Sequence, residues 1–292
     1  MIERAKSGRN GADIAIYAVL AVASLVFLYP FYYIISASFS DPASVIENPL
    51  LLYPVKFTLT AYKLLLSTSK IWLGYYNSII YTVCGTALNV TVTLLAAYAL
   101  SRQELAGRRV VLFFIVITLF FNGGMIPTYL VVKTLGMLDT RWALIVSGAV
   151  TTWNLLITRT FLETNIPQEL RDAAEVDGAG EFTFFTKIAL PLSRPIIAVI
   201  ALFYGSGHWN AYFNALIYIR QRDLYPLQVF LREMLILDQN TDMMGDVTDE
   251  RVLVALTLKF AIMVVAIAPL LLVFPFVQRF FVKGVLIGAL KE

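Results

Sequence analysis

Six long apolar runs limit what this chain can fold into more than any other feature of its sequence. Each run is close to the ~20 residues that an α-helix needs to cross a bilayer. Within lipid a segment has to satisfy its own backbone hydrogen bonds, which an α-helix does. The sequence therefore predicts an all-α, polytopic membrane protein with six transmembrane helices in a single transmembrane domain, residues 1–292. The runs lie at about 13–36, 77–100, 110–132, 142–162, 191–212 and 252–277.

The overall composition agrees with this class. Hydrophobic residues make up 59% of the chain and charged residues 15%, whereas a soluble domain has about 45–50% and about 25%. The net charge is +3, and no basic arm suggests a nucleic-acid partner. Cys84 is the only cysteine and His208 the only histidine, which excludes an intramolecular disulfide and a cysteine- or histidine-rich metal site. We therefore expect no metal site.

Basic residues predict the orientation of the spans. Arg4, Lys6 and Arg9 precede the first run, and the next basic residue after it is Lys56. Because Lys and Arg gather on the cytoplasmic side, the N-terminus is expected there. With six spans the C-terminus lies on the same side. The polar segment at about 163–190 is then cytoplasmic, and the one at about 214–250 is periplasmic.

The third run carries a predicted break. Its sequence includes "FNGGMIPTY", where Gly123 and Gly124 add backbone freedom and Pro127 removes a hydrogen bond. Such a break is tolerated in a bilayer only inside protein or beside a cavity. We therefore expect this span to kink toward the interior of the bundle.

The segment 163–190 predicts a helix, a glycine turn and a second helix. Pro167 suits the first turn of a helix and Glu169 its positive N-terminal end. Gly178 suits the position after the helix, where φ is often positive. Helical spacing places four residues on one nearly smooth face: Leu170, Ala173, Ala174 and Asp177.

The second helix of this segment is expected at about 181–188 and presents Phe184, Phe185 and Ile188. Periodicity alone leaves two interpretations open. The segment either docks into another protein or lies on the membrane surface as an ordinary amphipathic connector.

The spacing of Asp172-Ala173-Ala174, Asp177-Gly178-Ala179, Phe185, Ile188, Leu190-Pro191 and Pro195 resembles the "EAA" signature of ABC-importer permeases. One departure is Asp172, where that family usually has Glu. "PTYLVVKTLGMLDTRWALI", "HWNAYFNALIYI" and the tail "QRFFVKGVLIGALKE" are similar to maltose-type carbohydrate permeases. "FNGGMIPTYL" and "LYPLQVFLRE" resemble the branch that imports oligosaccharides from polysaccharide breakdown, including uronate-rich ones.

The resemblance implies a type I ABC-importer permease in the bacterial inner membrane and a set of partners. A second permease subunit, expected to form a heterodimer, completes the pore. An ATPase dimer carries the ATP and Mg²⁺, so this chain binds no cofactor and is not an enzyme. An extracytoplasmic binding protein delivers a carbohydrate. Coupling to the ATPase is implied for Asp172, Ala173, Ala174, Asp177, Gly178, Ala179 and Phe185.

Candidate substrate-pathway residues are the polar and aromatic residues of the spans, since polar groups within a bilayer usually face an interior or a cavity. They are Asn122, Trp153, Asn154, Trp209, Asn210 and Tyr212. Each can instead be a hydrogen-bond partner between helices.

No G-x-x-x-x-G-K-[ST] phosphate loop is present, so the chain does not hydrolyse ATP by itself. Two alternatives to a carbohydrate ABC permease remain. One alternative is a stand-alone secondary transporter or channel, although such proteins often bury acidic residues in their spans and these spans contain almost none. The other is an ABC permease for a non-sugar solute. The loop "RDAAEVDGAG" argues against the stand-alone carrier.

Overall fold

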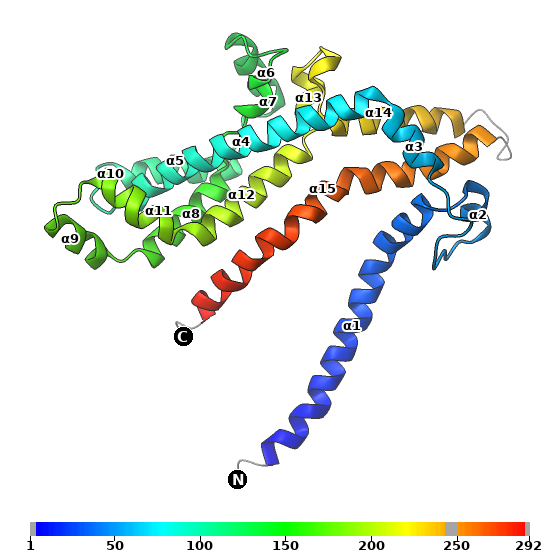
Figure 1. Cartoon of the computed structure of the whole chain (residues 1–292). Helices are drawn as coiled ribbons and strands as arrows, with labels where there is room; N and C mark the ends of the chain where they lie inside the picture. Colours follow the sequence, from blue (N-terminus) through cyan, green and yellow to red (C-terminus); the bar gives the residue numbers. More distant parts are fainter. Residues whose placement is uncertain (1–3, 243–249, 290–292) are drawn as a thin grey trace. The chain divides into compact units, whose positions relative to one another are not determined.

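The computed structural model describes residues 4–242 and 250–289, and all regular elements in these ranges are helical (Figure 1). The chain forms two compact units. Unit 1 contains Met1–Ser69 and Glu233–Ala268, and unit 2 contains Lys70–Arg232 and Pro269–Glu292. The elements are α1 (Arg4–Ser38), α2 (Pro42–Glu47), α3 (Thr60–Ser67), α4 (Ser69–Ser101), α5 (Arg108–Phe120), α6 (Met125–Thr134), α7 (Trp142–Ile145), α8 (Thr152–Asn165), α9 (Gln168–Val176), α10 (Glu181–Phe184), the π-helix η1 (Phe185–Ala189), α11 (Leu190–Leu192), α12 (Arg194–Trp209), α13 (Phe213–Tyr218), the 3₁₀-helix η2 (Arg222–Leu224), α14 (Leu227–Asp242) and α15 (Glu250–Ala289).

Three continuous helical segments are long and apolar enough to cross a membrane: Asp13–Ser38, Ser69–Ser101 and Thr257–Phe276. Two further candidates are bent pairs. Arg108–Phe120 and Met125–Thr134 meet at 119°, and Glu181–Leu192 and Arg194–Trp209 meet at 77°. Up to five spans are therefore present by length and composition among the described residues. The all-helical class is confirmed, and the count of six stays a prediction.

The predicted span at 142–162 is not one helix, which corrects the sequence-based expectation. α7 ends at Ile145 and α8 begins at Thr152. Gly148 lies between them with φ +81°, a left-handed conformation that ends a helix. The freed N–H of Thr151 donates to the Tyr204 hydroxyl at 3.1 Å, so protein replaces the lost helical partner. With 14 residues, α8 is about 21 Å long, short of the ~30 Å hydrocarbon core.

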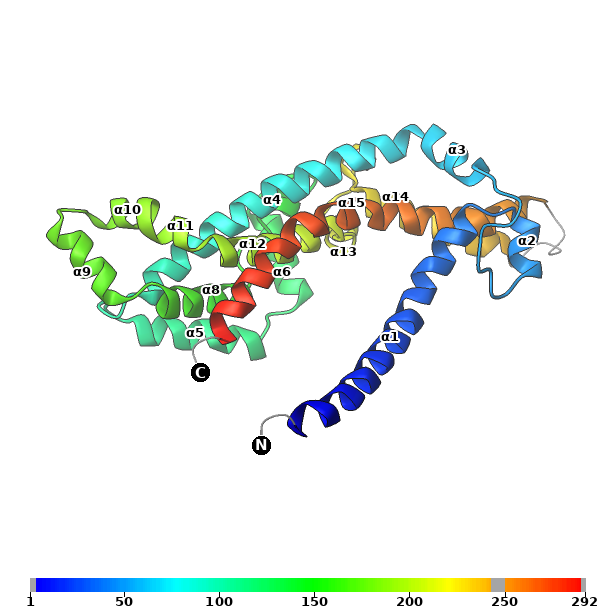
Figure 2. The same ribbon diagram turned by 60° about the horizontal axis from the view of Figure 1, so that its bottom comes forward.

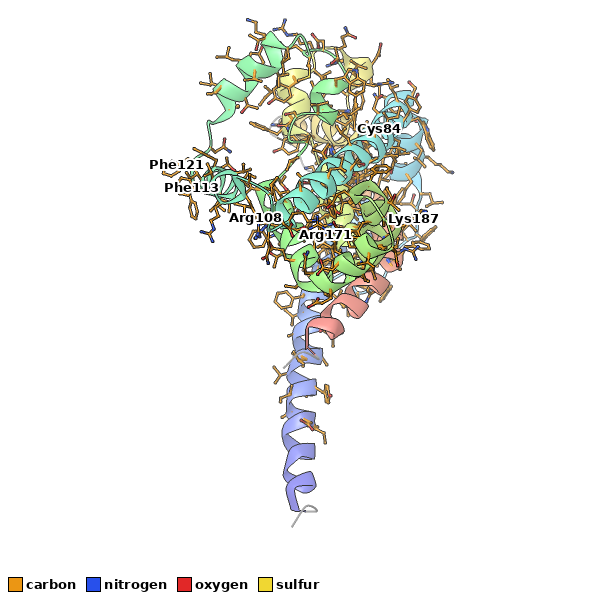
Figure 3. The ribbon with its side chains drawn as sticks, turned by 90° about the vertical axis from the view of Figure 1, so that its left-hand side faces the viewer. Cys84, Arg108, Phe113, Phe121, Arg171 and Lys187 are labelled. Atoms are coloured by element: carbon orange, nitrogen blue, oxygen red, sulfur yellow. The ribbon has the colours of Figure 1, made fainter. Side chains whose placement is uncertain are left out.

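The expected break in the third run is confirmed, and its direction toward the interior of the bundle stays a prediction. α5 ends at Phe120 and α6 begins at Met125, with Gly124 at φ +85° between them. Phe121 and Asn122 are exposed in this chain and do not turn into its interior. Figure 3 shows Phe113 and Phe121 pointing outward from α5. Leu112 and Ile115 of α5 pack against the core that α4 and α8 form, and the exposed apolar side chains of α5 are left facing lipid or another subunit.

In unit 2, α4 and α12 cross at Gly85. A Cβ atom at Gly85 would lie 2.4 Å from His208 Nε2, so only glycine fits there. Asn89, one turn further along α4, places its Nδ2 atom 3.0 Å from the same His208 nitrogen. The hydroxyls of Thr93 in α4 and Tyr204 in α12 lie 2.7 Å apart. These buried polar contacts fix the register of the two helices.

Unit 1 is smaller and has its own core. Ala37 at the end of α1 packs with Val45 and Leu51, and Tyr33 meets Phe260 of α15 edge to face at 5.8 Å. The connection after α1 is fixed by backbone hydrogen bonds, including Thr58 N–H to the Phe39 carbonyl at 2.9 Å.

Candidate functional site: a coupling helix and a polar pocket

α9 is a short helix with both ends defined by local sequence. Pro167 occupies the N-cap with φ −61°, one position earlier than the expected first turn. Glu169 lies in the first turn, where the helix dipole favours a carboxylate. After the C-cap Asp177, Gly178 has φ +79°. Its N–H donates to the Glu175 carbonyl, and the Ala179 N–H donates to the Ala174 carbonyl, both at 2.9 Å. This is a Schellman motif, and the predicted position of Gly178 is confirmed.

Most of α9 faces outward. Ala174 is its one buried residue, and Asp172, Ala173 and Asp177 are exposed. Val176 at the end of the helix is 88% exposed. The expected smooth face is therefore divided, with Ala174 turned inward and Ala173 outward. Figures 1 and 2 place α9 at one end of unit 2, beside α8 and α10.

The aromatic residues after the turn correct a second expectation. Phe184 is 2% exposed instead of being presented to a partner, and Phe182 is the exposed ring at 78%. Phe185 and Ile188 are half-buried. The reason is η1, since a π-helix brings residues five apart onto one face. Phe184 and Ala189 therefore share a small core with Ala174.

Ion pairs tie α9 and α10 to the end of α4. One guanidinium nitrogen of Arg171 in α9 donates a hydrogen bond to Glu104 at 2.9 Å, and another donates to Glu181. The second Glu181 oxygen accepts from the Tyr98 hydroxyl at 2.8 Å and from Arg102 at 3.3 Å. Figure 3 labels Arg171 at this end of unit 2. We call Tyr98, Arg102, Glu104, Arg171 and Glu181 the α9 network.

The pKa values of this network follow its charges. Burial raises the pKa of Glu181, but the Tyr98 hydrogen bond and the charges of Arg102 and Arg171 outweigh it, so the net pKa lies below the ordinary value. Glu104 also has a lowered pKa, first through a backbone hydrogen bond and then through Arg171. For Arg171 burial lowers the pKa, and the two carboxylates more than compensate. All three groups are therefore charged at neutral pH.

A second ion cluster joins three helix ends nearby. Glu163 near the end of α8 pairs with Arg108 at the start of α5 and with Arg159 in α8. The Arg159–Glu163 distance is 2.6 Å. Both arginines also donate to the Leu100 carbonyl of α4, at 2.8 and 3.3 Å. These carbonyl bonds occupy an acceptor that the end of α4 leaves without a helical partner.

Sequence reasoning missed both ion clusters. The signal was the concentration of charge in "SRQELAGRR" and "RDAAEVDGAGE" of a chain with few charged residues. Which acid meets which base could not be read, because Glu104 and Arg171 lie 67 positions apart.

A polar pocket of about 190 Å³ lies within unit 2. Its lining includes one candidate pathway residue, Asn154, which is 5% exposed. His208 and Asn214 line it as well, with Tyr204 and Asn89. The Asn89 Oδ1 atom is buried and has no hydrogen-bond partner among the described residues. The lining is uncharged and rich in amide and hydroxyl groups, which suits hydroxyl-bearing ligands or water.

The other pathway candidates lie elsewhere. Trp209 is buried and lines a separate apolar cavity. Asn210 caps α12 by donating to the Ser206 carbonyl at 2.9 Å. Tyr212 is exposed beneath the Arg232 guanidinium, 5.3 Å from its ring centre. Trp153 and Asn122 are exposed. The structure thus brings Asn154 to the pocket and leaves the other five outside it.

Long apolar helices with a short, exposed helix between them are the features of a membrane-embedded protein that carries a surface for a partner. Residues 90–287 match the family of binding-protein-dependent transport system inner membrane components. The chain belongs to this family and is a permease subunit, not the ATP-hydrolysing one.

Two relatives and one solved structure cover nearly the whole chain. The polygalacturonan/rhamnogalacturonan transport system permease protein YtcP of Bacillus subtilis (strain 168) is 42% identical over 96% of this chain and 98% of its own. Protein LplC of the same strain is also 42% identical, over 98% and 96%. A subunit in the crystal structure of a bacterial ABC transporter involved in the import of the acidic polysaccharide alginate is 32% identical, with a TM-score of 0.81 over 94% of this chain and 98% of that one.

Proposed function

We propose that this chain is one of two permease subunits of a bacterial inner-membrane ABC importer for acidic oligosaccharides from polysaccharide breakdown. The observation that carries the proposal is similarity along almost the entire chain to proteins named for polygalacturonan/rhamnogalacturonan transport and alginate import. The partners are a second permease, an ATPase dimer that holds ATP and Mg²⁺, and an extracytoplasmic binding protein. Both termini and α9 lie on the cytoplasmic side, as the positive charges near the first span favour.

In this assembly α9 docks into a cleft of the ATPase. Its outward face supports such a contact, because Val176 and Phe182 offer exposed apolar groups and Ala173 permits close approach. Asp172 and Asp177 supply carboxylates at the edge of that surface. Gly178 and Ala179 form the turn that holds the helix, and Phe185 packs behind it against Tyr98, with ring centres 4.8 Å apart. Closure of the ATPase dimer moves α9 and switches the spans between inward- and outward-facing states.

The substrate pathway passes the polar pocket. Asn154, His208 and Asn214 line it without any charged side chain, so this pocket meets sugar hydroxyls and not carboxylates. Asn122, Trp153 and Tyr212 are exposed in the single chain and would face a pathway shared with the second permease. Trp209 and Asn210 act by holding the end of α12.

The test is uptake by the complete complex reconstituted in vesicles. We expect ATP-dependent uptake of galacturonate oligosaccharides, with little uptake of neutral maltooligosaccharides of equal length. Equal uptake of the neutral sugars would contradict the acidic substrate. Solute movement by the chain alone, without ATP, would contradict the importer assignment and favour a secondary transporter.

A further inference from the structure

The α9 network joins α9 to the start of α10 and to the end of α4. The apolar packing of α9 rests on the small side chain of Ala174. The helix is followed by Gly178, Ala179 and Gly180, and a Cβ atom at either glycine would touch nothing within 4 Å. Beyond the two backbone hydrogen bonds of the Schellman motif and this small apolar core, the angle of α9 therefore depends on contacts of its polar side chains.

Arg171 supplies that contact. Its planar guanidinium reaches Glu104, in the loop after α4, and Glu181, at the start of α10. Two bonds from one rigid fork restrict rotation as well as distance. Glu181 in turn accepts from Tyr98 of α4 and from Arg102, whose guanidinium lies 4.4 Å from the Tyr98 ring centre and 5.1 Å from that of Phe184. The path through Glu181 thus reaches Tyr98 of α4 and Arg102 directly after it, and the other path ends at Glu104 in the loop that follows α4.

We propose that Arg171 and Glu181 are positioning residues that hold α9 at a fixed angle to α4, so that ATPase-driven displacement of α9 is passed to α4. This inference rests on the proposed function. It assigns to the network a role in coupling that is separate from the docking surface of α9, because the Arg171 side chain is only 19% exposed whereas Val176 is 88% exposed.

The first experiment measures sugar molecules transported per ATP hydrolysed by the reconstituted complex. We expect Arg171→Met and Glu181→Gln each to lower this ratio by about fivefold or more, the low end of typical coupling, while ATPase subunits still copurify. Arg171→Lys keeps the charge but loses the fork, and should give an intermediate ratio. Arg109→Met is the matched control, since Arg109 is exposed at the same end and forms no ion pair in the described part of the chain.

The second experiment measures the position of α9 directly. Cys84 is the only cysteine, so Cys84→Ser provides a background for spin labels at Glu169→Cys in α9 and Leu105→Cys in the loop after α4. We expect a narrow distance distribution in the complex, and a clearly broader one after Arg171→Met but not after Arg109→Met.

Two results would overturn the inference. One is an unchanged transport-to-ATP ratio in Arg171→Met, and the other is an unchanged distance distribution. A double variant, Arg171→Met with Glu181→Gln, should have a transport-to-ATP ratio no lower than that of the more impaired single variant, because both residues act through one network. A wild-type complex that fails to transport the acidic sugar would contradict the proposed function instead, and the spin-label distances would still test the positioning role.

Discussion

At the scale of single residues, the two glycines after α9 differ in the backbone they require. Gly178 has φ +79°, whereas Gly180 has φ −71° and caps α10. A β-carbon at Gly178 meets no neighbouring atom, so the penalty there is one of backbone conformation and not of space. For an L-residue this conformation costs about 1–2 kcal/mol.

We therefore predict that Gly178→Val lowers both the thermal stability of the α9 region and the transport-to-ATP ratio. Gly180→Ala is the control and should leave both close to wild type, because its φ is accessible to alanine. Hydrogen exchange of the α9 amides and uptake assays would measure the difference. Equal behaviour of the two variants would show that the left-handed residue is not what holds the turn.

Individual residues of the loop could be predicted from sequence only where the cause is local. The position of Gly178 depends on its own helix, and the sequence was sufficient for it. The burial of Phe184 depends on the π-helix η1 and on packing against Ala174 and Ala189. Sequence periodicity assumes a regular α-helix, so it assigned the exposed aromatic position to Phe184 instead of Phe182.

At the scale of helices, the crossing of α4 and α12 depends on an absent side chain. Gly85 leaves room for the His208 ring, which also contacts Asn89. Gly85→Ala should destabilise the protein by about 1–3 kcal/mol, as overpacking does. Gly207→Ala is the control, because a Cβ atom there has open space around it.

The double variant Gly85→Ala with His208→Ala should be about as stable as His208→Ala alone, since the clash has gone. Thermal unfolding of the purified complex in detergent would measure all four variants. If the double variant lost the full sum of the two single effects, the clash with His208 would not be the cause.

Helices could be predicted where residue composition determines their position, and could not where contacts between distant residues determine it. Runs of apolar residues predicted the helical class, and Gly123, Gly124 and Pro127 predicted the break in the third run. They did not reveal the break at Gly148, because the hydroxyl that satisfies Thr151 comes from Tyr204, 53 positions away. A membrane helix is also apolar on the side facing lipid, so the pattern that marks a buried face in a soluble helix is weak here.

At the scale of the whole molecule, the proposed orientation makes a labelling prediction. In a Cys84→Ser background, a cysteine at Arg222 should react with a membrane-impermeant maleimide in intact cells. A cysteine at Glu175 should react only after the membrane is opened. Both native side chains are exposed, so burial would not explain a difference. Labelling of Glu175→Cys in intact cells would reverse the orientation.

The length of α4 has a mechanical consequence. Its 33 residues form a rod of roughly 50 Å, so a tilt of about 10° about one end would displace the other end by roughly 9 Å. The Gly85–His208 contact fixes the point at which α4 and α12 cross, so we expect the two helices to move together. A tilt about the Arg102 end would thus displace the Ser69 end most, without α4 having to bend.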